Sequence, residues 1–193
     1  MANRFKKNSR KVINAWAFYD WSNSVYNLII STAIFPIFYE SVTKGTTKLR
    51  NGESVDVVTF LGREFVNTEL YSYVYSLSFL VVVIMVPILS GIADFSGTKK
   101  RFMQFFCYLG ALSCMSLYFF DVKHLEWSMV SVFFASIGFW GSLVFYNSFL
   151  VEIADKKFHD AISAKGFSLG YIGSVLLLVT ILALTQFSSV LEI

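Results

Sequence analysis

The charged residues of this chain enclose five long runs without any charge. The runs are Trp21–Tyr39, Leu70–Ala93, Phe102–Phe120, Trp127–Val151 and Gly166–Leu191, with 19, 24, 19, 25 and 26 residues. A helix needs about 20 residues to cross a hydrocarbon core of ~30 Å. The runs lack the strict alternation of a barrel strand, and only helices or closed barrels satisfy their backbone in lipid. The pattern predicts five transmembrane helices, at about 12–39, 70–93, 102–120, 127–151 and 166–187.

The composition favours the same fold class. Of the 193 residues, 55% are hydrophobic and 15% charged, whereas globular proteins average ~45–50% apolar and ~25% charged residues. A disordered chain is excluded by this apolar fraction. A disulfide-stapled secreted domain is excluded because there are two cysteines, Cys107 and Cys114, which we interpret as packing residues. We therefore predict an all-α membrane protein in contact with the lipid bilayer.

The basic residues predict the orientation, because Lys and Arg collect in cytoplasmic connections. Eleven of them fall before the first run or in the second and fourth connections: Arg4, Lys6, Lys7, Arg10, Lys11, Lys99, Lys100, Arg101, Lys156, Lys157 and Lys165. The third connection holds only Lys123, and the long segment 40–69 mixes both signs. We predict a multi-pass protein with a cytoplasmic N-terminus, and its short cytoplasmic loops favour a bacterial plasma (inner) membrane.

The segment 40–69 is predicted to be an outer loop. Asn51-Gly52 is followed by the β-branched stretch Val55–Phe60, which favours a small hairpin. We interpret this loop as a lid or packing element on the outer face.

The sequence lacks the common constellations of an intramembrane enzyme. Its two histidines, His124 and His159, fall between the runs, so no zinc pair or Ser–His dyad forms within one. A phosphate-binding glycine loop is missing as well. We predict no catalysis and expect no cofactor, metal or nucleic-acid partner.

Polar residues at the start of the first helix are candidates for substrate or proton coupling. Asp20, Asn23 and Asn27 are spaced i, i+3, i+7, and Tyr19 lies beside them. A carboxylate at a helix centre costs ~2.5–3.5 kcal/mol, so Asp20 requires a reason. One interpretation is a water-accessible cavity in which Asp20 carries a proton. The alternative is an interfacial Asp within an aromatic belt.

Tyr146 and Asn147 on the fourth helix form a second candidate group, although Asn147 also suits a hydrogen bond to a neighbouring helix. On the fifth helix, Gly166, Gly170 and Gly173 form a small-residue face. Such a face allows two helices to pack closely, here at a surface that can slide.

The connection Ser90–Arg101 combines an acid, a glycine and three cations. Gly97 allows a tight turn, and Asp94 is positioned to accept hydrogen bonds from the start of a neighbouring helix. Lys99, Lys100 and Arg101 suit an anchor at the headgroups. A turn that only reversed the chain would not need Asp94.

The stretch Gly91–Lys100 resembles the signature between the second and third helices of the major facilitator superfamily, with Ser90 at its first glycine position and Phe95 at a basic one. Ala15–Tyr26, Asn147–Ala154 and Ser163–Gly173 resemble the vacuole-effluxer branch of that superfamily, related to the fungal autophagy-linked vacuolar amino-acid exporter.

This resemblance implies twelve helices in two halves that alternate access between the membrane faces. Residues 1–193 are then expected to be an N-terminal fragment with five helices, whose partner is the missing C-terminal half. Carried onto matching positions, Asp94 and Gly97 serve a cytoplasmic gate, to which we add Gly91, Lys99, Lys100, Arg101 and Glu152.

The predicted function is secondary active or facilitative transport of a small solute, with amino acids as the first candidate and protons as a coupling ion. The alternative is a non-transporting membrane protein whose five helices assemble with partner chains.

Overall fold

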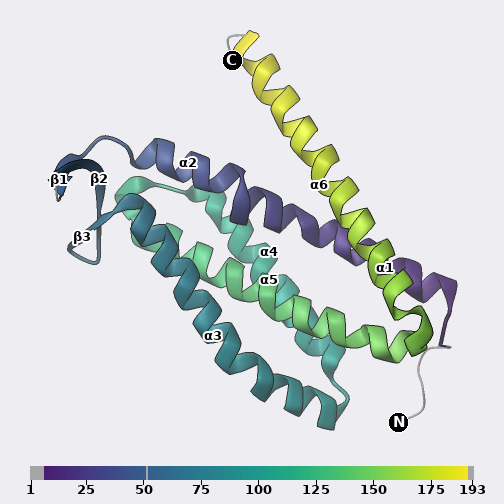
Figure 1. Ribbon diagram of the computed structural model, residues 1–193. Coiled ribbons are helices and arrows are strands. Elements are labelled where there is room, and N and C mark those ends of the chain that lie inside the picture. Colours follow the sequence, from purple (N-terminus) through teal and green to yellow (C-terminus); the bar gives the residue numbers. More distant parts are fainter. Residues whose placement is uncertain (1–6, 51, 191–193) are drawn as a thin grey trace. The chain divides into compact units, whose positions relative to one another are not determined.

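The structure, a computed structural model, describes residues 7–50 and 52–190 (Figure 1). Arg4, Lys6, Asn51 and Leu191, which entered the predictions above, lie outside the described residues.

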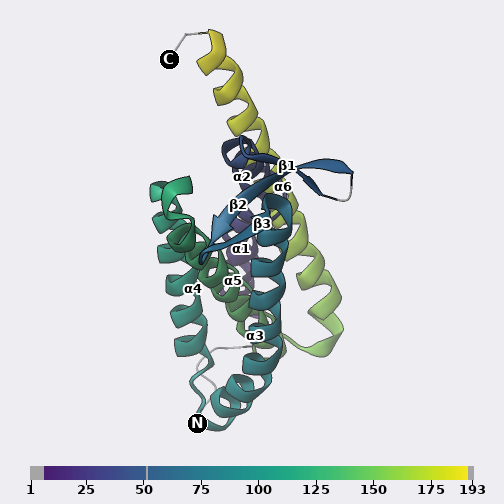
Figure 2. The same cartoon turned by 90° about the vertical axis from the view of Figure 1, so that its left-hand side faces the viewer.

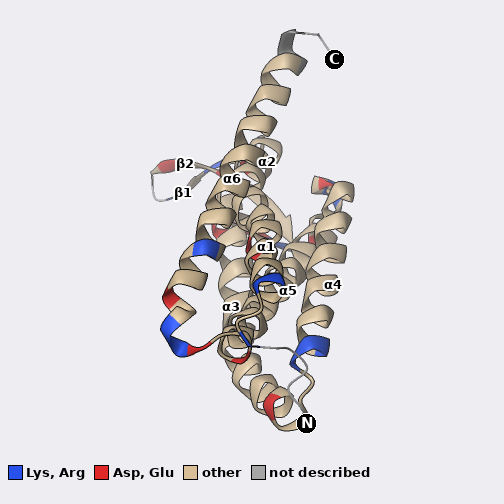
Figure 3. Ribbon diagram, turned by 90° about the vertical axis from the view of Figure 1, so that its right-hand side faces the viewer, with Lys and Arg blue, Asp and Glu red and all other residues tan. Residues whose placement is uncertain are grey.

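Within the described residues, five helical segments are long and apolar enough to cross a membrane: Arg10–Thr43, Asn67–Ser96, Lys99–Phe119, Val122–Ile153 and Lys156–Phe187. Their regular helices are α1 (Arg10–Tyr26), α2 (Ile34–Thr43), α3 (Asn67–Ser96), α4 (Lys99–Ser116), α5 (Leu125–Ile153) and α6 (His159–Val190). Figure 3 shows that charged residues gather towards the ends of these segments. The predicted all-α membrane bundle is confirmed.

The first span is interrupted, unlike the single helix predicted over 12–39. A π-helical segment, η1 (Asn27–Thr32), separates α1 from α2. The Thr32 hydroxyl donates to the Asn27 carbonyl at 2.8 Å, and the Ala33 amide donates to the Leu28 carbonyl at 3.0 Å. Pro36 explains the break, because it has no amide hydrogen and its ring clashes with the carbonyl four residues earlier.

The other helices begin before the predicted ranges, and α3, α5 and α6 also end beyond them. Short 3₁₀ turns at Leu117–Phe119, Val122–His124 and Lys156–Phe158 flank them. The predictions used only uncharged residues, but the helices continue through charged residues such as Glu69 and Lys165. Helix ends that reach the polar interface can carry these groups, because a bilayer with its headgroup regions is about 40–45 Å thick.

The segment after α2 forms three antiparallel strands rather than one hairpin. They are β1 (Thr47–Arg50), β2 (Glu53–Phe60) and β3 (Arg63–Val66), with Lys48 opposite Val55 and Val58 opposite Phe65 (Figure 2). The second turn contains Leu61 and Gly62 with φ of 50° and 73°. Leucine seldom adopts a positive φ, so Leu61 gave no turn signal in the sequence.

The described chain divides into two compact units. The first contains α1, η1, the end of α5 and α6, and the second contains residues 37–147. In the first unit α1 packs along α6. Buried Ile153, Ala154 and Ile162 contact Val12 and Trp16 near one end of this pair.

The second unit has an aromatic core between α3, α4 and α5. The Phe145 ring stacks on Phe102 and Phe106, with centroids 5.5 Å and 6.0 Å apart. The buried Ser78 hydroxyl of α3 donates to the Ser136 hydroxyl of α5 at 2.7 Å. These contacts bury aromatic area and pair the polar groups among it, as close packing in lipid requires.

Candidate functional site

The candidate coupling residue Asp20 lies where α1 contacts α6. A Cβ atom added at Gly170 would lie 3.4 Å from the Asp20 carboxylate. Asp20 is half-buried, and Gly170 is buried. The missing side chain at position 170 thus leaves room beside the carboxylate, within a segment long enough to span a membrane.

The other coupling candidates of the first helix do not all share the environment of Asp20. Tyr19 and Asn23 are half-buried, whereas Asn27 is exposed. The spacing argument assumed an α-helix, but η1 begins at Asn27 and follows a wider turn. The polar face is therefore regular only as far as Tyr26.

The three predicted glycines of α6 are all buried. At Gly173 an added Cβ would lie 2.6 Å from the indole nitrogen of Trp21, closer than such atoms approach in real structures. Gly170 and Gly173 therefore admit two side chains of α1, one acidic and one aromatic.

Polar contacts that the sequence did not reveal also join segments of the first unit. Lys165 Nζ donates to Asn14 Oδ1 at 2.6 Å. Asn8 Nδ2 donates to Asp155 Oδ2 at 2.7 Å, and Asn8 Oδ1 accepts from the Asp155 amide at 3.0 Å. Asn8 has a φ of 62°, which asparagine tolerates better than most residues. Nothing local in the sequence links it to a partner 147 positions away.

The predicted gate turn is held by its own residues. Gly97 ends α3 with a φ of 65°, and the Thr98 amide donates to the Ala93 carbonyl at 3.1 Å. Lys99 Nζ lies 2.7 Å from Asp94 Oδ1. This ion pair joins Asp94, near the end of α3, to the side chain of the first residue of α4.

Other gate candidates have different surroundings. A Cβ at Gly91 would meet no described atom within 4 Å. Lys100 and Arg101 are exposed at the start of α4, and Glu152 is exposed near the end of α5. Glu152 belongs to the first unit and the Asp94 turn to the second.

Tyr146 and Asn147 both lie on α5, the first buried and the second exposed. They belong to the second unit, whereas Asp20 belongs to the first.

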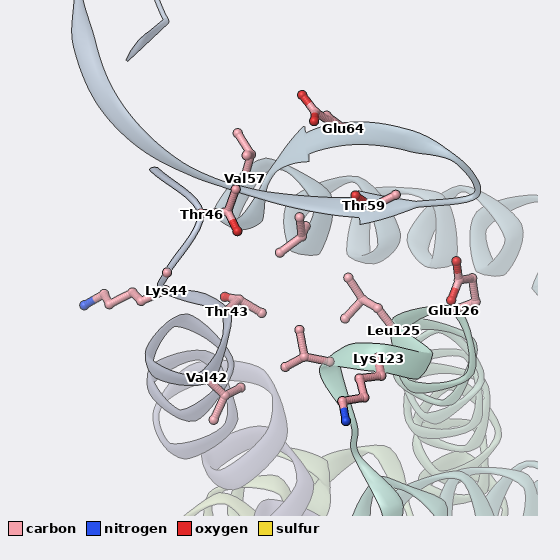
Figure 4. Close-up of a pocket in the computed structure, with 13 residues that line it drawn as sticks. Val42, Thr43, Lys44, Thr46, Val57, Thr59, Glu64, Lys123, Leu125 and Glu126 are labelled. Carbon is pink, nitrogen blue, oxygen red and sulfur yellow. The ribbon is translucent and has the colours of Figure 1, made fainter. Parts of the chain in front are cut away.

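A cavity of about 370 Å³ lies beneath the three-stranded sheet (Figure 4). Thr43, Val57 and Leu125 line it, and the side chains of Lys44 and Lys123 point away from its centre. The Leu61 amide donates to Glu126 at 3.3 Å and so joins the second turn of the sheet to α5. Within residues 7–50 and 52–190, no group of three or more His, Cys, Asp or Glu could hold a metal ion.

Comparison with known proteins identifies the lineage. Residues 8–159 match the family described as "Vacuole effluxer Atg22 like". The "Uncharacterized MFS-type transporter YxiO" of Bacillus subtilis (strain 168) is 37% identical over 179 residues, which are 91% of this chain and 37% of that protein. "Autophagy-related protein 22" of Coccidioides immitis (strain RS) is 25% identical over 170 residues, 74% of this chain and 28% of that protein.

No solved structure matches the chain. The chain spans well under half the length of these relatives. The name of the Bacillus subtilis relative and the description of the family agree with the prediction of a transporter rather than an enzyme. Because the match covers residues 8–159, the chain belongs to the Atg22-like vacuole effluxer family, within the major facilitator type of membrane transporter.

Proposed function

We propose that this chain is part of a secondary transporter that moves a small solute by alternating access, with amino acids as the first substrate class to test. Membership in the effluxer family and a relative named as an MFS-type transporter support this proposal. The helices that complete the translocation path are proposed to lie outside the 193 residues, because the relatives are much longer than the matched stretch.

The observation that carries the proposal is Asp20 at the contact between α1 and α6. A carboxylate within a membrane segment costs free energy, and such residues usually mark substrate, ion or proton pathways. Gly170 leaves space beside the carboxylate. A neighbouring leucine or phenylalanine would fill that space and exclude water.

Asp20 can serve two kinds of ligand. As a carboxylate it binds the ammonium group of an amino acid. When protonated, it carries a proton through the same transport cycle. Tyr19 and Asn23 add a hydroxyl and an amide nearby in the sequence, which can hydrogen-bond a polar solute. A zwitterionic or cationic amino acid therefore suits this group better than an anionic solute.

The helix contacts suit movement during transport. Gly170 and Gly173 bring no side chain of α6 into the contact with Asp20 and Trp21 of α1, so α6 can shift along α1 without changing rotamers of its own at these two positions. The Asp94–Lys99 ion pair is proposed to belong to the cytoplasmic gate. In this proposal the N-terminus is cytoplasmic and the protein resides in a bacterial inner membrane.

The test is a solute screen with a chimera in which this chain replaces the stretch that it matches in YxiO. Proteoliposomes with the chimera, with unaltered YxiO and with no protein are exposed to labelled amino acids of each charge class. We expect the chimera to accumulate a zwitterionic or cationic amino acid above the empty vesicles.

An inserted, folded chimera that moves none of these solutes would contradict amino-acid transport. If unaltered YxiO transports a solute and the folded chimera moves none, the rival proposal of a non-transporting interaction protein gains the support.

A further inference from the structure

An apolar groove lies between α3 and α4 of the second unit. Its volume is about 500 Å³, within the roughly 300–1,000 Å³ of small-molecule sites. Met85 and Leu89 of α3 form one side, and Phe102, Phe105 and Phe106 of α4 form the other. Phe105 is 59% exposed, so one wall remains open to the surroundings.

The floor of the groove is formed before any ligand binds. Phe106 is 1% exposed, and the Phe102 and Phe106 rings stack on Phe145 of α5. A bound ligand would thus contact an aromatic surface that is already ordered, which lowers the entropic cost of binding.

The polar mouth of the groove carries a cation that no described residue neutralises. Thr98 and Arg101 line this end. Arg101 forms no ion pair with any residue in the described ranges 7–50 and 52–190, whereas the nearby Lys99 is paired with Asp94 at 2.7 Å. Lys100, also exposed, precedes Arg101 in the first turn of α4 and adds a second positive charge to this helix end.

The order of these groups matches the order of groups in a phospholipid. Arg101 stands in the first turn of a membrane helix, and Phe105 follows one turn, about 6 Å, further along α4. A guanidinium binds phosphate through two parallel hydrogen bonds. Basic pockets between transmembrane helices recognise anionic headgroups in this way.

We propose that this groove binds one anionic phospholipid, whose phosphate contacts Arg101 and whose acyl chain lies against Leu89, Phe105 and Phe106. The charge of the mouth selects the headgroup, because a zwitterionic lipid would leave Arg101 and Lys100 without a net counter-charge. The proposal does not depend on transport activity, so each can fail alone.

Native mass spectrometry of the 193-residue chain tests the proposal directly. The chain is released from detergent after incubation with equal amounts of palmitoyl-oleoyl phosphatidylglycerol and palmitoyl-oleoyl phosphatidylcholine, which share their acyl chains. We expect single phosphatidylglycerol adducts to outnumber phosphatidylcholine adducts by about tenfold. Both lipids offer a phosphate to Arg101, but the choline ammonium of phosphatidylcholine offsets that charge, whereas phosphatidylglycerol stays net negative.

Matched variants locate the site. Arg101→Gln should abolish the preference for phosphatidylglycerol, while Lys123→Gln, which removes an exposed cation outside the groove, should preserve it. Leu89→Trp should reduce adducts of both lipids by filling the groove.

Equal binding of the two lipids by the unaltered chain would overturn the proposal, as would equal loss of the preference in Arg101→Gln and Lys123→Gln. A dimer without lipid adducts would also overturn the proposal if Leu89→Trp abolished that dimer, because the groove would then be assigned to a second copy of the chain.

Discussion

The α4–α5 contact and the α1–α6 contact both depend on glycines, but they admit different groups. At Gly138 of α5 the backbone of α4 approaches so closely that an added Cβ would lie 2.5 Å from Gly110 Cα and 2.8 Å from the Phe106 carbonyl oxygen. At Gly170 and Gly173 of α6 the approaching atoms belong to the Asp20 carboxylate and the Trp21 indole. Small residues thus allow close backbone packing in one unit and admit an acidic and an aromatic side chain in the other.

Replacing Gly138 by alanine is expected to have the largest effect on stability. Backbone atoms of α4 cannot move aside as a side-chain tip can, so overpacking should cost about 1–3 kcal/mol or more. Unfolding of the purified chain in mixed micelles, followed by tryptophan fluorescence, measures the loss.

The matched control is Gly91→Ala on α3, where a methyl group meets no described atom within 4 Å. Its expected effect is neutral to stabilising by up to about 1 kcal/mol, because alanine is the better helix former. Equal destabilisation by both substitutions would show that the close approach at Gly138 is not what stabilises this unit.

At the α1–α6 contact, Gly173→Ala is expected to cost less than Gly138→Ala, because the indole of Trp21 can rotate away. If the methyl group acts through the indole, Trp21→Ala should relieve most of the cost, with a coupling energy of about 0.5–3 kcal/mol. A double-mutant cycle of unfolding free energies measures it. Strictly additive effects would refute the contact.

Gly170→Ala should change stability little, because its Cβ would lie at 3.4 Å from Asp20, a distance to which a side chain adjusts. Its effect should appear instead in solute uptake by the YxiO chimera, which we expect to fall several-fold. Serine at the same position provides the control, because its hydroxyl can hydrogen-bond the carboxylate. If Gly170→Ala instead lost stability and kept normal uptake, Gly170 would serve close helix packing, as Gly138 does, and not the environment of Asp20.

The smallest expected effect belongs to the buried Ser78–Ser136 hydrogen bond of the aromatic core. Interhelical hydrogen bonds in membrane proteins average about 0.6 kcal/mol. Ser78→Ala and Ser136→Ala should therefore show a coupling energy of this order in a double-mutant cycle of unfolding. A coupling several times larger would mean that polar contacts, and not the Phe145 stack, dominate the core.

The sequence predicted the membrane segments because lipid imposes one requirement, a long uncharged helix, that each run meets by itself. It also indicated the glycine face of α6 from spacing alone. The sequence analysis did not predict the π-helical segment Asn27–Thr32, because the ring of Pro36 disturbs the helix four residues before the proline itself. Three close contacts also escaped: Asn8 with Asp155, Gly110 with Gly138, and Ser78 with Ser136. Each joins residues from distant segments, and a single sequence contains no information on which small or polar residues meet.

The most direct test of proton coupling through Asp20 is proton-driven uptake by the YxiO chimera carrying Asp20→Asn. The matched control is Asp160→Asn, which removes an exposed carboxylate in the first turn of α6. The proposal predicts that Asp20→Asn abolishes the response of uptake to an imposed pH gradient and weakens solute exchange while folding is kept, and that Asp160→Asn preserves both. An unchanged response in Asp20→Asn would contradict the role assigned to Asp20.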